Sequence, residues 1–130
     1  MKDTGLRFQD QVDESLIHHR SILDVLTKLQ ESTARVSRAI AKSVTSCGCI
    51  SIDARKQQVP ADVGLAELRA YLNTHVDGGL CERCREAVET EIGAVLFYLA
   101  GLCNVLGLDL EAVQAKEHSR LRSLGIFSLK

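Results

Sequence analysis

The chain has 130 residues, of which 45% are hydrophobic, 25% charged and 4% aromatic, and its formal net charge is −1. This composition is typical of one globular domain and excludes a disordered chain. It leaves no broad positive surface for nucleic acid, and the scarcity of aromatic residues disfavours base stacking. The amino-terminal stretch MKDTGLRFQDQVDE carries acids and lacks the apolar run of a signal peptide, so we expect a cytoplasmic protein. In the reducing cytosol its five cysteines should stay reduced.

Apolar residues recur at three- and four-residue spacing across residues 6–46, with polar residues between them. This spacing predicts two successive amphipathic helices, with a break near His18 to Ser21. The stretch ISIDA, at residues 50–54, alternates apolar and polar side chains and predicts a short extended segment that ends before Pro60.

Three further helices are expected in the rest of the chain. The stretch ADVGLAELRAYLNTH, at residues 61–75, predicts a short helix with Asp62 as its cap. A turn at Gly78 and Gly79 leads into a long helix over about residues 80–106. The final helix begins at its cap, Asp109, and ends at Gly125.

The run IGAVLFYLAGLCNVLGL, at residues 92–108, contains no charged residue. It is at the short end of the membrane-spanning range and is interrupted by Asn104 and three glycines, so a buried helix is favoured over a membrane segment. A helix that is apolar on every side needs cover on every side, which a monomer of this size hardly supplies. We therefore expect a homodimer or higher homo-oligomer and no membrane association.

These elements predict an all-α fold, an antiparallel bundle of four to five helices in a single domain spanning residues 1–130. An irregular insertion, at about residues 47–84, separates the second helix from the long one.

Cysteine pairs stand at both ends of the predicted insertion. Cys47 and Cys49 flank one glycine, and Cys81 and Cys84 are separated by two residues. Two close pairs suit a tetrahedral four-thiolate site, because each short turn supplies two sulfurs and the fold only has to bring two turns together. Gly48 allows the first turn to be tight. The sequence therefore predicts a structural metal site, with zinc as the favoured ion.

Other interpretations of the thiols stay open at this point. An iron–sulfur cluster also takes four thiolates. A redox pair at Cys81 and Cys84, or incidental thiols, are further alternatives, although a thioredoxin-like motif belongs to a βαβ pattern that this chain lacks. His75 is a candidate to replace one sulfur and otherwise a surface residue. Cys103 lies in the apolar run and is expected to pack in the core.

Two stretches resemble the MazG-like all-α nucleotide pyrophosphohydrolases. ETEIGAVLFYLAGLCNVLGLDLEAVQAKE is similar to the second half of that family's pattern, a Glu-x-x-Asp motif followed by a VLWYLA-type run and NxLGIDLEEAVxxK. KLQESTARVSRAI is similar to the preceding half, KLxEExGELxxAI. The resemblance covers roughly residues 22–46 and 88–118, and its matching positions include Glu91, residues 95–100, Asn104, Gly107, Asp109 and Lys116.

The resemblance implies a carboxylate site on two facing helices. In the family, four of the carboxylates on these helices gather Mg²⁺, which helps a water molecule attack a nucleoside triphosphate and release pyrophosphate. At the matching positions this chain has Glu31 and Glu91. Ser32 and Arg35 stand where the other two glutamates of the first motif belong, and Ala94 stands where the aspartate belongs. The implied site is a degenerate one, because loss of carboxylates and gain of a cation weaken Mg²⁺ binding.

The face of the second helix that carries Arg35 also carries Arg38 and Lys42, at spacings of three and four residues. These cations are candidates to bind phosphate directly, with the arginine fork holding two oxygens, or they form a solvated basic stripe. Glu31 and Glu91, in turn, are either residual catalytic groups or helix residues that are solvated or paired with Arg35.

Two functions follow. The first is a metal-stabilised nucleotide- or phosphate-binding or regulatory module without hydrolysis. The second is an active Mg²⁺-dependent nucleoside triphosphate pyrophosphohydrolase in which Glu86 or Glu89 supplements the two retained glutamates.

Overall fold

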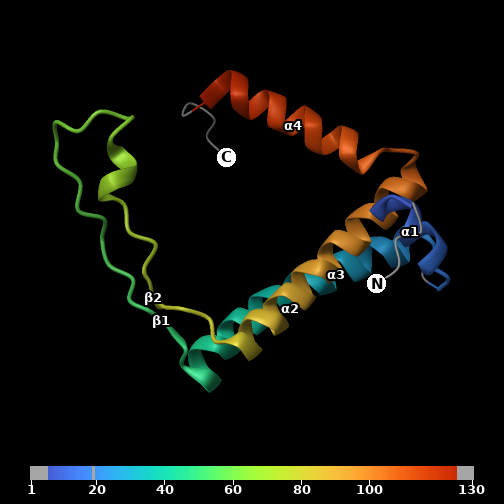
Figure 1. Cartoon of the computed structure of the whole chain (residues 1–130), viewed down its shortest axis with the longest axis horizontal. Coiled ribbons are helices and arrows are strands. Elements are labelled where there is room, and N and C mark those ends of the chain that lie inside the picture. The colour runs from blue at the N-terminus through green and yellow to red at the C-terminus, as the bar shows by residue number, and fades with distance from the viewer. Residues whose placement is uncertain (1–5, 19, 126–130) are drawn as a thin grey trace.

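Two long antiparallel helices dominate the structure, a computed structural model that describes residues 6–18 and 20–125 (Figure 1). The first is α2 (Ile22–Lys42), which continues as one π-helical turn, Ser43–Cys47. The second is α3 (Glu82–Leu106). We call this pair the hairpin. The cysteine pairs lie at one end of it, where α2 finishes and α3 begins.

Of the two remaining helices, the first lies at the opposite end of the hairpin, and the second starts there and runs back above the hairpin (Figure 1). They are α1 (Phe8–Ser15), which packs on α3, and α4 (Leu110–Leu124). The predicted break between the first two helices is confirmed, and Ser21 caps α2 by accepting a hydrogen bond from the Leu23 amide at 3.3 Å. His19 of that break lies outside the described residues.

Asp109 caps α4 as predicted. Its carboxylate accepts hydrogen bonds from the amides of Glu111 and Ala112, at 3.0 and 3.5 Å. The Arg7 guanidinium lies 3.3 Å from the same carboxylate, and its hydrogen bond lowers the pKa of Asp109. This side chain therefore ties the chain before α1 to the start of α4.

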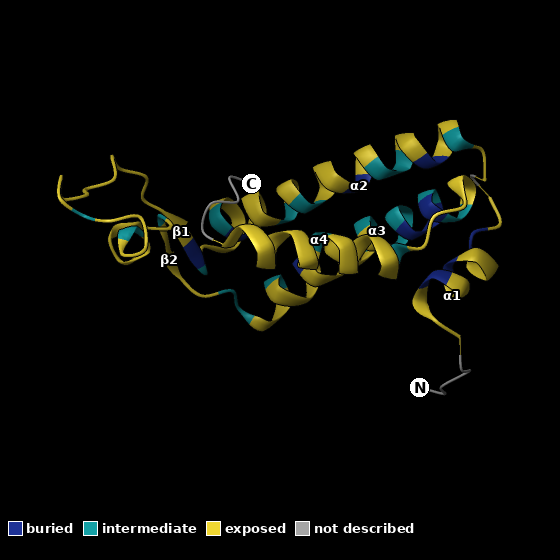
Figure 2. Cartoon of the chain, turned by 90° about the horizontal axis from the view of Figure 1, so that it is seen from above, coloured by how far each residue is buried: buried dark blue, intermediate teal, exposed yellow. Residues whose placement is uncertain are grey.

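The core of the described chain is small (Figure 2). The buried residues of α2 are Val25 and Ser32, and Ser43 of the following π turn continues this face at spacings of seven and eleven residues. This face of α2 packs on α3. Two of these three residues are serines, so the contact between the helices is close but contributes little apolar area. The buried apolar residues are Val12, Leu16, Val25, Ile50, Val88, Ala100 and Cys103.

The predicted mostly helical class is confirmed, but one expected helix is absent. Residues 61–75 form turns and a single 3₁₀ turn, η2 (Leu68–Tyr71), so Asp62 caps no helix there. The physical reason is that the leucines of this stretch find no surface to pack on, and a short isolated helix is marginal in water.

Residues 50–80, which we call the arm, project away from the hairpin (Figure 1). A two-stranded antiparallel ribbon forms the base of the arm, β1 (Ile50–Ile52) with β2 (Val76–Gly78). This is the extended segment that the alternation predicts. No residue from 51 to 80 is buried. The arm therefore has no core of its own, and its position depends on how its two ends are held.

Helix α3 is long and apolar enough to cross a membrane, by length and composition alone. Its most apolar 18-residue window has a mean hydropathy of 1.3, and 22% of that window is buried. The helix is thus apolar in composition, but few residues of this window are buried. Its exposed apolar side chains are available for a further packing contact.

Candidate metal centre

The end of α2 is shaped to bring two sulfurs to one side of a turn. The amide of Gly48 donates to the Ser43 carbonyl, five residues earlier, at 2.8 Å. Gly48 has φ +81°, in the left-handed region that glycine adopts readily. The wide π turn and this glycine carry the chain from Cys47 round to Cys49, in agreement with the tight turn that the sequence predicts. Such π turns are common at functional sites.

The start of α3 supplies the second pair. Cys81 is the amino-terminal cap of the helix, and its sulfur accepts a hydrogen bond from the Cys84 amide at 3.4 Å. The base of the ribbon brings this pair to the first one, because Gly78 pairs with Ile50. Gly78 has φ +85°, and a Cβ atom there would stand 2.6 Å from the Cys49 carbonyl oxygen. Only glycine allows so close an approach of the two strands.

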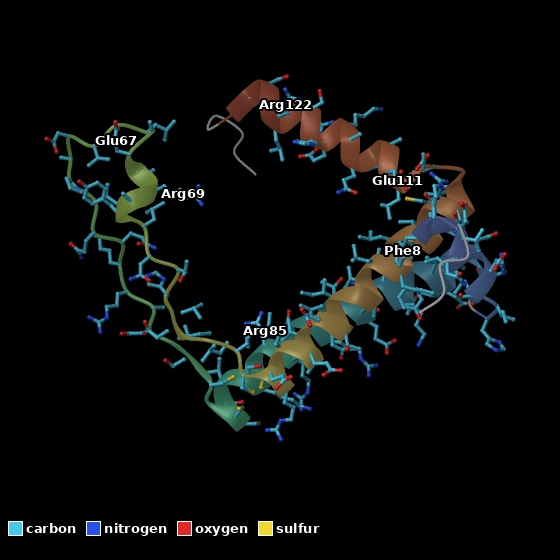
Figure 3. The ribbon with its side chains drawn as sticks, in the orientation of Figure 1. Phe8, Glu67, Arg69, Arg85, Glu111 and Arg122 are labelled. Atoms are coloured by element: carbon cyan, nitrogen blue, oxygen red, sulfur yellow. The ribbon has the colours of Figure 1, made fainter. Side chains whose placement is uncertain are left out.

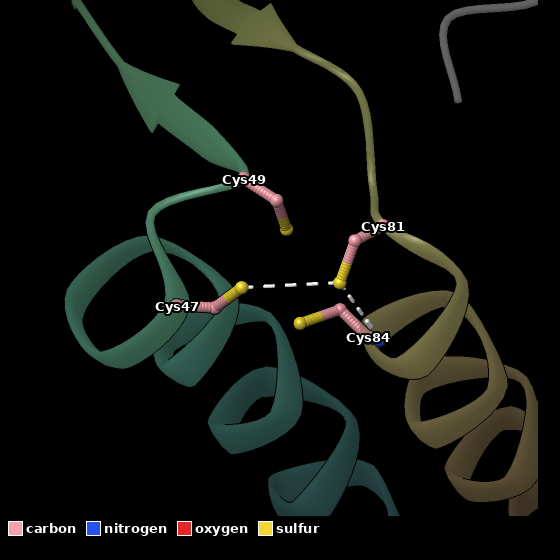
Figure 4. Close-up of side chains that lie close together, drawn as sticks. All are labelled: Cys47, Cys49, Cys81 and Cys84. Carbon is pink, nitrogen blue, oxygen red and sulfur yellow. Dashed lines mark hydrogen bonds between the residues drawn. The ribbon is translucent and has the colours of Figure 1, made fainter.

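The four sulfurs converge on one point (Figure 4). The Sγ atoms of Cys47, Cys49, Cys81 and Cys84 all lie within 4.8 Å of one another. The Cys47 and Cys81 sulfurs are 3.8 Å apart. A Zn–S distance of about 2.3 Å gives a tetrahedron with edges of about 3.8 Å. The four cysteines are free thiols in a cluster of the size that a metal ion needs.

The thiols differ in acidity. The hydrogen bond from the Cys84 amide lowers the pKa of Cys81 to about 7. A hydrogen bond with Ser43 opposes a rise in the pKa of Cys84, but the nearby sulfur of Cys81 and burial outweigh it and raise that pKa to about 11. A second negative charge is therefore costly beside the first unless a cation joins the cluster.

The other candidate ligands take no part in the cluster. His75 lies at the far end of the ribbon, with φ +63°, and its carbonyl accepts a hydrogen bond from the Asp53 amide at 3.0 Å. Cys103 is 7% exposed, and burial raises the pKa of its thiol. The prediction that Cys103 packs in the core is confirmed.

The carboxylates implied by the family resemblance meet through an arginine. The Arg35 guanidinium lies 3.4 Å from Glu31 on its own helix and 3.4 Å from Glu91 on α3. The pairing that the sequence analysis left open is therefore present. Ser32, at a position where the family has a glutamate, is only 4% exposed in the packed face of α2, which leaves little room for a longer charged side chain.

A cleft of about 930 Å³ runs along the hairpin and joins these two regions. Cys47 and Cys84 line one end of it, and Arg35 and Glu91 line the other. Glu31 and Cys47 are sixteen residues apart in the sequence, whereas the packing of α2 on α3 makes the two regions parts of one cleft. The three predicted phosphate-binding residues, Arg35, Arg38 and Lys42, all line it.

The cleft is lined by further polar residues that were not predicted from the sequence. Arg83 of α3 adds a fourth cation, and Ser46 and Thr90 add hydroxyl groups. The signal for Arg83 was its place between the two cysteines of the second pair. Glu86 also lines the cleft, whereas Glu89 does not.

Three of these cations are unpaired. Within residues 6–18 and 20–125, Arg38, Lys42 and Arg83 form no ion pair or side-chain hydrogen bond. Unpaired cations in a concave site favour an anionic ligand.

The fold and the site define a mostly helical protein with a four-cysteine cluster within metal-binding distance. Comparison of the chain with protein-family models, with curated proteins and with solved structures found no match.

Proposed function

We propose that this chain is a zinc-stabilised helical protein that binds a phosphate-bearing ligand in the cleft between α2 and α3. The observation that carries the proposal is the set of unpaired cations, Arg38, Lys42 and Arg83, in a cleft that ends at the four-sulfur cluster. The predicted cytosolic location is compatible with reduced thiols that stay available to a metal.

The size of the cluster favours a single ion over an iron–sulfur cluster. In a cluster of several irons, the cysteines bind different metal atoms and their sulfurs stand further apart than the ligands of one ion. All four sulfurs here lie within 4.8 Å, and one pair is at the spacing expected for zinc. With four thiolates the site is closed, which supports a structural rather than a catalytic role.

The charge of such a centre decides where a ligand's phosphate can lie. Zn²⁺ with four thiolates carries a formal charge of −2, which the nearby Lys42 and Arg83 offset. Arg38 is nine residues before Cys47, about 13 Å along the helix. That distance exceeds the Debye length of about 8 Å at physiological salt, so the centre is largely screened there. We therefore place the phosphate at the Arg35–Arg38 end of the cleft, with Thr90 beside it on α3.

The pyrophosphohydrolase alternative has less support. Its Mg²⁺ would have to bind where the Arg35 guanidinium contacts Glu31 and Glu91. A cation in that position opposes a second cation. Glu86 is the one further acid of the cleft, and it does not replace the carboxylates that the MazG-like pattern has at positions 32, 35 and 94.

A binding measurement on the zinc-loaded protein tests the proposal. We expect inorganic pyrophosphate and a nucleoside triphosphate to bind in isothermal titration calorimetry, and Arg38→Gln to weaken binding about tenfold or more through loss of a charged hydrogen bond. The control is Arg122→Gln, which removes another exposed cation from α4, far from the cleft (Figure 3). It should leave the affinity unchanged.

The same samples separate the two functions. Release of pyrophosphate from a nucleoside triphosphate with Mg²⁺ or Mn²⁺, abolished by Glu91→Gln, would establish the hydrolase and overturn the binding-only role. Absence of binding by both probes, or equal weakening by Arg38→Gln and Arg122→Gln, would remove the cleft from consideration.

A further inference from the structure

The flank of the hairpin opposite the cleft is apolar. Successive residues of a helix are about 100° apart, so Leu26, Leu29 and Ile40 lie about 120–180° around α2 from Arg35. Thr33 is the one polar residue on this stripe. Leu26 and Ile40 are 46% and 38% exposed. The amphipathic pattern of α2 thus includes a stripe that α3 does not cover.

Helix α3 continues the same surface. Ile92, Leu96 and Leu99 follow one another at spacings of four and three residues, on the side of α3 away from the cleft residues Arg83 and Thr90. Ile92 and Leu96 are 45% and 46% exposed. The two stripes together form one apolar face of the hairpin, made by Leu26, Leu29, Ile40, Ile92, Leu96 and Leu99.

The total exposed surface shows how much cover is missing. The chain exposes 10095 Å². A folded monomer of 14.3 kDa is expected to expose about 6,800 Å². The excess, about 3,300 Å², is in part due to the arm, but it is larger than the surface of about 1,000–2,500 Å² that each subunit covers in an obligate dimer.

The surroundings of the apolar face favour a protein partner over a lipid bilayer. Six charged residues lie on α2, which packs along α3 and would have to enter the bilayer with it.

Helix α4 is a second uncovered element beside the apolar face. It has no buried residue, and it runs above the hairpin in Figure 1. Arg85, which lies between Ile92 and Leu96 around α3, is on the side of the hairpin that faces α4 (Figure 3).

We propose that a second copy of this chain covers the apolar face, so that two hairpins form a four-helix core in a symmetric dimer. The second copy then lies between the hairpin and α4, where it also covers the exposed side chains of Val113 and Leu121. The cleft and the cysteine cluster are on the opposite flank and at one end, so each chain keeps its own site open to ligand. This interface does not depend on the identity of that ligand.

Sedimentation equilibrium of the zinc-loaded full chain tests the dimer. We expect a mass twice the 14.3 kDa of one chain. Leu96→Glu should raise the dimer dissociation constant about a hundredfold or more, because each interface would contain two buried acids. The matched control is Leu72→Glu. It places the same acid at a leucine of the arm that is 48% exposed, against 46% for Leu96, and should leave the mass unchanged.

Circular dichroism of both variants separates dissociation from unfolding, because a variant that only dissociates keeps its helical content. Ile92→Glu provides a second test of the same face. A wild-type monomer at about 100 μM would overturn the proposal. Dissociation by Leu72→Glu alone would also overturn the proposal, because it would place the interface on the arm. Recovery of the wild-type chain only in the membrane fraction would overturn it as well.

Discussion

Replacement of Cys81 by serine is expected to remove zinc from the protein and to lower its melting temperature. The metal content should fall from about one zinc per chain to nearly none. The melting temperature should fall by about 10 °C or more, because the arm and the start of α3 lose the link that holds them to the end of α2. Cys81 has the largest effect expected of the four ligands, since its sulfur is 3.8 Å from Cys47 and also caps α3. Elemental analysis of protein purified without a histidine tag, together with differential scanning calorimetry, measures both quantities.

The control is Cys103→Ala. This residue is a buried cysteine outside the cluster, so its loss should lower stability by removing packing but leave one zinc per chain. Equal metal loss in both variants would show that the cluster is not the site. A wild-type protein that carries no metal would remove the zinc proposal itself, and iron with acid-labile sulfide would replace zinc by a cluster.

Replacement of Gln9 by alanine is expected to destabilise the fold by about 3 kcal/mol. Gln9 is 7% exposed. Its side-chain amide donates to Asn104 Oδ1 at 2.9 Å and to the Leu108 carbonyl at 2.7 Å, and its carbonyl oxygen accepts from the Leu110 amide at 2.7 Å. The substitution leaves the part-buried Leu108 carbonyl and Leu110 amide, between α3 and α4, without these hydrogen-bond partners. Urea unfolding at saturating zinc measures the change.

Gln11→Ala is the matched control on the same helix. Gln11 is exposed, and its side chain bonds only with Ser15 at 3.3 Å among the described residues. We expect a change of about 0.5 kcal/mol or less. Similar losses of stability for the two variants would mean that the Gln9 hydrogen bonds contribute little beyond the helix itself.

The helices were predictable to different degrees, for physical reasons. Helix α2 shows its period in the sequence because one face packs and the other is charged. The start of α4 was predictable because Asp109 caps it through a local interaction. The leucines at residues 65, 68 and 72 have the same kind of spacing but form no α-helix, and none of them is buried against the rest of the described chain. Spacing shows that a face needs cover and does not identify the surface that covers it.

The role of Gln9 was not predictable. A glutamine in an amphipathic helix is usually solvated, and its burial depends on the junction of α3 and α4, about a hundred residues later in the chain. The ion-pair partners of Arg35 were predictable from the sequence only in part. Glu31 is four residues earlier on the same helix, but contact with Glu91 required the register of α2 against α3.

The sequence by itself determined the mostly helical class, the position of the break before α2 and the cysteines that make up the cluster, because each depends on local spacing. Tertiary structure decided three further features. It brought four sulfurs within 4.8 Å, joined the cluster and the Arg35 region into one cleft, and left one flank of the hairpin uncovered. These features depend on the relative placement of α2 and α3, which is set by the packed face around Val25, Ser32 and Ser43. Such placement is a property of two surfaces together, and the pattern of either helix alone does not contain it.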